Sequence, residues 1–207
     1  MNRLTEFHFT VGKVGWYLFL LNLYWVFFTI LGLIIFGVSP ATDALYTILV
    51  EDERKGDFEN KGLFRKFFYH YKNNFWKSNK LILPLIFFLL FLISELNLLR
   101  EYLFLSIDSL VFSVLKWVSF AFTVFGLNVL WFGQFENSNR NVYKKSIILL
   151  LGKPFLTLMN FLLCLVTFSI YYLYPGIIIV FGGSLFFYLQ VKLFSAQTFI
   201  VNLSRAV

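Results

Sequence analysis

Five long apolar runs constrain this chain more than any other feature of its sequence. They cover about residues 14–36, 79–99, 109–133, 154–174 and 176–199. A helix needs about 20 apolar residues to cross the hydrocarbon core of a bilayer, so each run is long enough. The chain is 59% hydrophobic and only 14% charged, with 29 Phe in 207 residues, which is too apolar for a water-soluble core of this size. The sequence predicts an all-α integral membrane protein with five transmembrane helices in a single membrane domain, residues 1–207.

The distribution of Lys and Arg predicts the orientation in the membrane. The loops after the first and third runs are rich in both, whereas the other side carries Arg3, Lys13 and Arg100. Cytoplasmic loops carry an excess of positive charge. We therefore expect both large loops and the C-terminus in the cytoplasm and the N-terminus outside, in a bacterial cell membrane. The first run is too long for the apolar region of a signal peptide, about 7–15 residues, so we expect it to be retained.

The segment 39–77, between the first two spans, predicts two amphipathic cytoplasmic helices. Gly37 and Pro40 are expected to end the first span, and Ser39 to cap a helix whose first turn carries Asp43. The second helix combines basic residues with an aromatic stripe, formed by Leu63, Phe64, Phe67, Phe68, Tyr71 and Phe75. This pattern is typical of a helix in the headgroup plane that is attracted by anionic lipid. Two interpretations stay open: the segment anchors the chain at the cytoplasmic face, or it docks a partner.

Two blocks in this segment resemble a known family. The first is Gly37-x-x-Pro40-Ala41-Thr42-x-Ala44-Leu45-Tyr46, and the second is Phe67-Phe68-x-x-Tyr71-Lys72-x-Asn74-Phe75. They resemble the YesL-like proteins, small bacterial membrane proteins with a domain of unknown function, although Tyr71 stands where Phe is more usual. Because genes of this family are commonly found beside carbohydrate ABC importers in Gram-positive bacteria, the resemblance implies an accessory or scaffolding subunit of such an importer. It implies no catalytic residues.

The expected partners are therefore the membrane subunits of a carbohydrate ABC importer, together with anionic lipid at the cytoplasmic face. The candidate docking residues come from the two blocks: Pro40, Ala41, Thr42, Leu45, Tyr46, Phe67, Phe68, Tyr71, Lys72, Asn74 and Phe75. Two alternative functions are a small self-standing carrier or channel, and a membrane regulator of the nutrient response.

Polar residues within the spans are a second set of candidates, because ionisable groups are costly in hydrocarbon and often functional there. Lys116 and Lys192 lie near span ends, so they either snorkel to the interface or line a transport pathway. Asn128 lies mid-span, as do Asn22, Asn160 and Gln190, and such amides usually hydrogen-bond neighbouring helices. The small residues Gly182-Gly183-Ser184 offer a place for another helix to approach, from this chain or from a partner.

The remaining chemistry argues against an enzyme. His8 and His70 are expected on opposite sides of the membrane, and Cys164 is the only cysteine, so no metal site is predicted. The sequence contains neither a phosphate-binding Gly-rich loop nor a nucleophile motif, and no cofactor is implied. The net charge of +7 is assigned to the cytoplasmic loops rather than to nucleic-acid binding.

Overall fold

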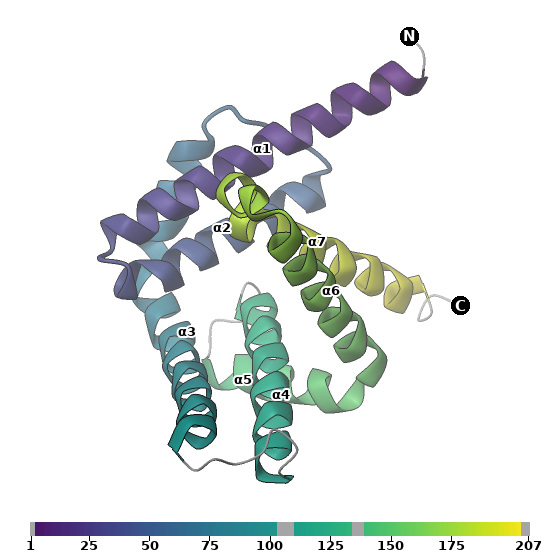
Figure 1. The fold of residues 1–207 in the computed structure, drawn as a ribbon. Coiled ribbons are helices and arrows are strands. Elements are labelled where there is room, and N and C mark those ends of the chain that lie inside the picture. Colours follow the sequence, from purple (N-terminus) through teal and green to yellow (C-terminus); the bar gives the residue numbers. More distant parts are fainter. Residues whose placement is uncertain (1–2, 103–109, 134–138, 204–207) are drawn as a thin grey trace. The chain divides into compact units, whose positions relative to one another are not determined.

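The computed structural model describes residues 3–102, 110–133 and 139–203, which form seven helices and no strand (Figure 1). The all-α prediction is thereby confirmed. The helices are α1 (Arg3–Leu31), α2 (Ile35–Lys55), α3 (Leu63–Tyr102), α4 (Leu110–Gly133), α5 (Asn139–Gly152), α6 (Pro154–Leu173) and α7 (Pro175–Leu203). Ser109, Arg205 and residues 103–108 of the expected outer turn lie outside the described residues.

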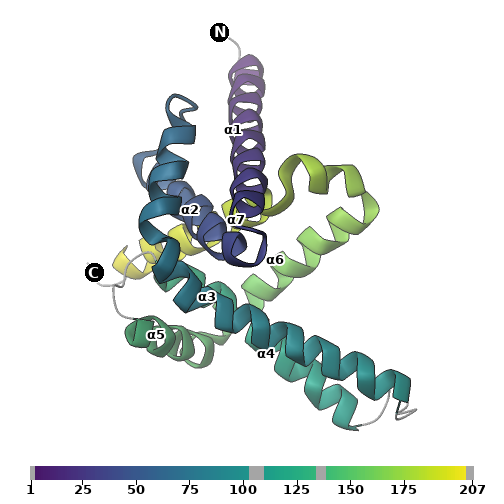
Figure 2. The ribbon, with the colours of Figure 1, turned by 90° about the vertical axis from the view of Figure 1, so that its left-hand side faces the viewer.

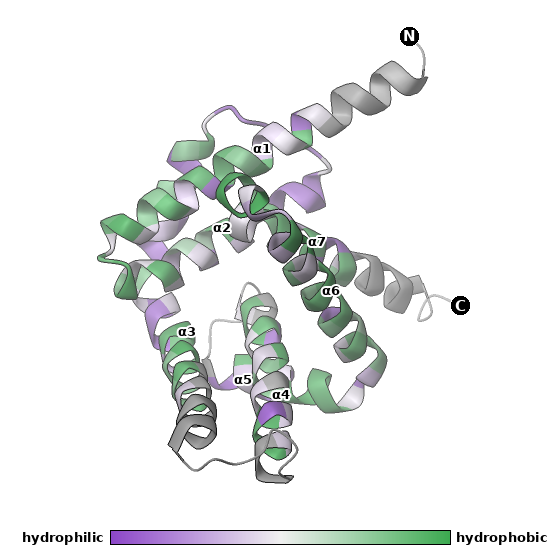
Figure 3. Cartoon of the chain, viewed as in Figure 1, coloured by the Kyte–Doolittle hydropathy of each residue, from purple (hydrophilic) through white to green (hydrophobic). Residues whose placement is uncertain are grey.

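Among the described residues, five helices are long and apolar enough to cross a membrane. They are α1 over Gly12–Leu31, α3 over Leu63–Leu92, α4 over Ser113–Leu130, α6 over Pro154–Leu173 and α7 over Pro175–Ser195. Figure 3 shows apolar residues along most of each of these helices. The prediction of a multi-pass helical membrane protein is confirmed.

The first span ends earlier than expected. Helix α1 stops at Leu31, and α2 begins at Ile35, inside the apolar run predicted to extend to Phe36. The chain reverses at Leu33 and Ile34, which both adopt positive φ angles, of 58° and 62°. Gly37 and Pro40, expected to end the span, therefore lie within α2.

Two glycines allow the reversed chain to pack closely. A Cβ on Gly32 would overlap the Cα of Gly37, and a Cβ on Gly37 would overlap the carbonyl oxygen of Thr29. The backbones of α1 and α2 therefore touch where they leave the turn. The result is an antiparallel helical hairpin, and Figures 1 and 2 both show α1 and α2 side by side.

The second predicted amphipathic helix and the second span form one continuous helix. Helix α3 runs for 40 residues from Leu63 to Tyr102, whereas a separate span was expected over 79–99. The polar stretch between the two parts stays helical because its side chains find partners. Asn74 bonds Asp43, and Lys77 donates to the carbonyl of Gly133, 3.2 Å away.

The last span, expected over 176–199, is interrupted at Gly182, where φ is 28° and ψ is −116°. In an apolar medium the carbonyl groups freed by such a kink need new donors. The Asn22 amide donates to the carbonyl of Ile179 at 3.1 Å, and the Tyr171 hydroxyl donates to that of Gly182. Asn22 thus bonds a neighbouring helix as predicted. The Asn22 Oδ1 also lies 2.5 Å from where a Cβ of Gly182 would be. The helix that approaches this small residue is therefore α1 of the same chain.

The chain divides into two compact units, Met1–Trp76 with Met159–Val207, and Lys77–Leu158. In the first unit, α1, α2 and α7 pack on one another in pairs. In the second unit α4 packs on α5, and the Tyr143 hydroxyl donates to the carbonyl of Leu81 on α3 at 2.8 Å.

Candidate functional site

The first block of candidate docking residues lies in the protein core. Helix α2 packs against α1 and α7, and the Tyr46 ring meets Phe187 of α7 edge to face, with centroids 5.7 Å apart. Burial raises the pKa of the Tyr46 hydroxyl well above its usual range. All five predicted residues of this block are buried: Pro40, Ala41, Thr42, Leu45 and Tyr46. The structure therefore places these five residues in contact with the chain's own helices, and their docking role stays a prediction.

Most of the second block also faces inward. Phe67 and Tyr71 are buried against the Phe28 ring of α1, with centroid distances of 5.1 and 5.0 Å. Asn74 donates from Nδ2 to the carboxylate of Asp43 at 2.9 Å. Phe75 is half-buried against Tyr71. The two blocks come together, and Phe67, Tyr71 and Asn74 contact elements of their own chain.

One face of α3 nevertheless remains on the surface. It carries Phe64, Phe68, Lys72 and Trp76, spaced four residues apart, and all are exposed. Trp76 is the most exposed of the three aromatic residues, at 72%, whereas Phe68 is 45% exposed. We refer to these four residues as the outer face of α3. Only Phe68 and Lys72 belong to the predicted docking set; Trp76 was missed, although its spacing of four from Lys72 places it on the same helix face.

A partly buried charged cluster, centred on the buried Asp52, holds α3 on the hairpin. The carboxylate of Asp52, on α2, accepts hydrogen bonds from the Tyr17 hydroxyl at 2.6 Å and from the Lys66 ammonium. Lys66 also pairs with Glu51 at 3.1 Å, and His70 Nε2 lies 3.4 Å from the same carboxylate. This cluster was not predicted from the sequence. The signal was an acidic triplet at 51–53 followed by basic residues at 65–66.

The intramembrane candidates lie in three different environments. Lys192 of α7 pairs with Glu53 at 2.7 Å and lies over the rings of Phe58 and Tyr188. It therefore ties α7 to the end of α2. Lys116 is exposed on α4. Asn128 is fully buried, and neither polar atom of its side chain has a hydrogen-bond partner.

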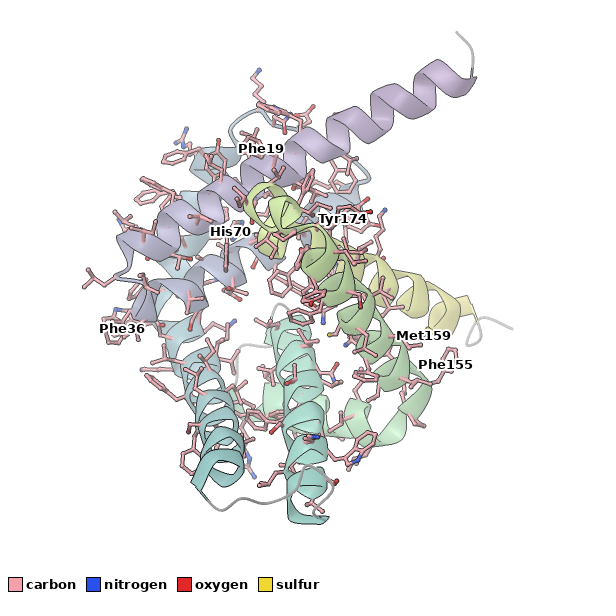
Figure 4. The ribbon with its side chains drawn as sticks, in the orientation of Figure 1. Phe19, Phe36, His70, Phe155, Met159 and Tyr174 are labelled. Atoms are coloured by element: carbon pink, nitrogen blue, oxygen red, sulfur yellow. The ribbon has the colours of Figure 1, made fainter. Side chains whose placement is uncertain are left out.

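A groove of about 1010 Å³ runs beside the kink of α7, and Phe19, Leu23 and Phe27 of α1 form part of its wall. Figure 4 marks Phe19 on α1. The other walls come from the start of α3, from α6 and from α7, and they are mostly aliphatic and aromatic. Such a lining suits hydrocarbon and offers no set of acids, bases or nucleophiles. Among the described residues, no group of three or more His, Cys, Asp or Glu could hold a metal ion.

These features define a multi-pass helical membrane protein whose recognisable polar contacts hold its own helices together. The sequence matches the family described as "Protein of unknown function, DUF624" over residues 18–96. It is 32% identical over 176 residues to the uncharacterized protein YteU of Bacillus subtilis (strain 168). This alignment covers 83% of this chain and 76% of YteU. It is 29% identical over 185 residues to the uncharacterized protein YesL of the same organism, covering 84% of this chain and 80% of YesL.

The chain belongs to this DUF624 family, as the two sequence blocks predicted. No solved structure matches it. The region matched by the family contains the second half of α1, all of α2, most of α3 and the charged cluster around Asp52 except Tyr17.

Proposed function

We propose that this protein is a non-enzymatic accessory or scaffolding subunit of a bacterial carbohydrate ABC importer, located in the cell membrane. The observation that supports a binding role is the outer face of α3, which presents three exposed aromatic side chains and Lys72 at helical spacing. The proposed partner, the membrane subunits of a carbohydrate ABC importer, is the one that the family resemblance implies.

The outer face of α3 suits binding because its inner side is fixed. Lys66 and Asn74 tie α3 to the carboxylates of Asp52 and Asp43 on α2, and Phe67 and Tyr71 pack on α1. Aromatic side chains held by a rigid helix lose little conformational freedom on binding, and Trp and Tyr are frequent hot spots of protein interfaces. Lys72 and the neighbouring Arg65 can also contact anionic headgroups at the cytoplasmic face.

The test replaces Phe68 and Trp76 together with alanine. We expect the double variant to insert at the normal level but to lose on the order of tenfold or more of its co-purification with the importer's membrane subunits, since one hot spot contributes about 2 kcal/mol. The measurement is affinity purification in mild detergent followed by quantitative mass spectrometry.

A matched control makes the same chemical change elsewhere on α3. Phe87 and Phe91 are also exposed, at 54% and 55%, and the Phe87→Ala, Phe91→Ala variant should co-purify normally. If the Phe68, Trp76 variant retains full co-purification, the outer face of α3 does not dock the importer.

One observation favours a second candidate, the self-standing carrier. Asn128, Asn160 and Gln190 are each fully buried, and none of their side-chain amide atoms has a hydrogen-bond partner in the described structure. Buried amides of this kind can receive a polar solute or water.

Reconstitution distinguishes the two candidates. As an accessory subunit, the purified protein alone in liposomes should take up no labelled oligosaccharide above the level of empty liposomes. Saturable uptake by the protein alone, abolished by Asn128→Leu, would instead establish the carrier.

A further inference from the structure

We propose that α5 is an interfacial helix that binds anionic phospholipid, with its basic N-terminal half at the headgroups and its apolar C-terminal half among the acyl chains. The residues concerned are distinct from the outer face of α3, and the inference does not depend on the importer proposal.

Helix α5 lies at a membrane face because it connects two helices that are each able to cross the bilayer. The candidate spans cover Ser113–Leu130 of α4 and Pro154–Leu173 of α6. With 14 residues, α5 is about 21 Å long, which is short of the roughly 30 Å of hydrocarbon. The chain therefore leaves the bilayer after α4 and enters it again at Pro154, on the same face. We expect this face to be the cytoplasmic one, because the connection is basic.

The contacts of Tyr143 hold α5 against the spans rather than out in water. Its ring stacks on Phe125 of α4, with centroids 6.2 Å apart, and its hydroxyl donates to the carbonyl of Leu81 on α3 at 2.8 Å. Phe125 and Leu81 both belong to candidate spans. Phe125 lies five residues before Leu130, or about 7–8 Å along the helix. Interfacial amphipathic helices are buried to about the same depth, 5–10 Å.

The exposed side of α5 changes from basic to apolar along its length. Val142 and Ser146 are buried on the inner side of the helix. On the opposite side, exposed residues follow one another at intervals of three or four and continue into the start of α6; they are Arg140, Lys144, Ile148, Leu151 and Phe155. We refer to these five residues as the outer stripe of α5. Ile148, Leu151 and Phe155 are 64%, 76% and 65% exposed, and Figure 4 marks Phe155 at the start of α6.

The charge of this segment complements a phosphate group. Residues 136–155 contain four basic residues, Arg140, Lys144, Lys145 and Lys153, against one acid, Glu136, which lies outside the described residues. Basic residues of an amphipathic helix attract anionic headgroups. A soluble phosphate compound would contact only the basic half of the outer stripe and would leave its three large apolar side chains in water. A phospholipid contacts both halves, which identifies it as the occupant.

Quenching by brominated lipids tests the site in full-length protein that carries Cys164→Ala and Leu151→Cys, labelled with a bimane fluorophore. The protein is reconstituted in phosphatidylcholine vesicles that contain brominated phosphatidylglycerol or, in parallel, brominated phosphatidylcholine. The ratio of the two quenching constants measures the preference for the anionic headgroup. The same label at Tyr174→Cys is the positional control, because Tyr174 lies in the connection at the other end of α6.

We expect brominated phosphatidylglycerol to quench the label at 151 about fivefold or more better than brominated phosphatidylcholine, since one basic residue near an anionic surface contributes about that factor. The label at 174 should show no such preference. Arg140→Gln combined with Lys144→Gln should remove the preference at 151. The charge-conserving pair Arg140→Lys and Lys144→Arg should retain it, and loss of the preference in that pair would overturn the role of charge.

A matched control removes two charges elsewhere. Lys55→Gln with Lys61→Gln acts on exposed residues beside the acidic Asp57 and Glu59 and should leave the preference at 151 unchanged; its loss there would reveal a general surface effect and overturn the site. Equal quenching of the label at 151 by the two lipids would overturn the anionic specificity. Absence of quenching by either lipid would overturn the interfacial position of α5. Loss of the preference in excess soluble glycerol phosphate would overturn phospholipid as the occupant.

Discussion

Replacing Gly37 with alanine is expected to prevent the α1–α2 hairpin from closing. The added methyl group would overlap the carbonyl oxygen of Thr29 and press on the Cα of Gly32. Both are backbone atoms, so no side-chain rotation relieves the overlap. We expect a loss of about 3 kcal/mol or more in the free energy of unfolding, at the upper end for overpacking substitutions. The measurement is the apparent melting temperature of the detergent-solubilised protein, followed by fluorescence-detected size-exclusion chromatography.

Gly15→Ala is the matched control on the same hairpin. Gly15 lies in α1, and a Cβ built there has no neighbour within 4 Å. Alanine has a higher helix propensity than glycine by about 0.8–1 kcal/mol, so this variant should be unchanged or slightly more stable. Equal melting temperatures for the Gly37 variant and the wild type would contradict the close approach of α1 and α2.

Replacing Asp52 with alanine is expected to loosen the start of α3 from the hairpin. The substitution leaves the Tyr17 hydroxyl without its acceptor and leaves Lys66 with Glu51 alone. Removing one member of a fully buried pair costs about 3–5 kcal/mol; because Lys66 keeps Glu51, we expect about 2–3 kcal/mol in the free energy of unfolding. The readout is again thermal stability in detergent, with cleavage of the 56–62 loop by trypsin as a local measure.

Asp57→Ala supplies the comparison, because Asp57 also forms an ion pair with α1 but does so at the surface. The side chains of Lys13 and Asp57 are 45% and 52% exposed, and such pairs contribute about 0–1 kcal/mol.

A second test combines Asp52→Ala with Tyr17→Phe. If the hydroxyl and the carboxylate act as one unit, the double variant should lose less stability than the sum of the single variants. Additive losses, or equal losses at Asp52 and Asp57, would show that the cluster does not hold the three helices together.

The two stability experiments also bear on the proposed importer contact. The outer face of α3 is presented to a partner only while Lys66 and Asn74 hold the helix from its inner side. We therefore interpret co-purification only for variants that retain wild-type melting behaviour. Phe68 and Trp76 suit this purpose, because both side chains lie at the surface rather than in the core.

The sequence by itself determined the class of protein and its family. The lengths of the apolar runs at 14–36, 79–99, 109–133, 154–174 and 176–199 predict five membrane-spanning helices, because a helix in hydrocarbon satisfies its own backbone hydrogen bonds without help from distant residues. The two blocks at 37–46 and 67–75 indicated the family. Asn22 could be assigned an interhelical hydrogen bond, since an amide inside a span has few other partners.

Only the tertiary structure decided which surfaces are free. The apolar stripe of α2 is the same whether that helix lies on a membrane surface or in a protein core, so the burial of Tyr46 depends on α7, which is more than 100 residues away in sequence. The reversal at residues 32–34 was hidden because residues 23–38 around it contain no Pro, Asn or Asp. It depends on two glycines that meet across the turn. Likewise, the aromatic stripe of α3 divides into an inner and an outer face only where Phe28 and Asp52 pack against it. Burial is a property of the elements that meet, and a helix taken alone does not specify its neighbours.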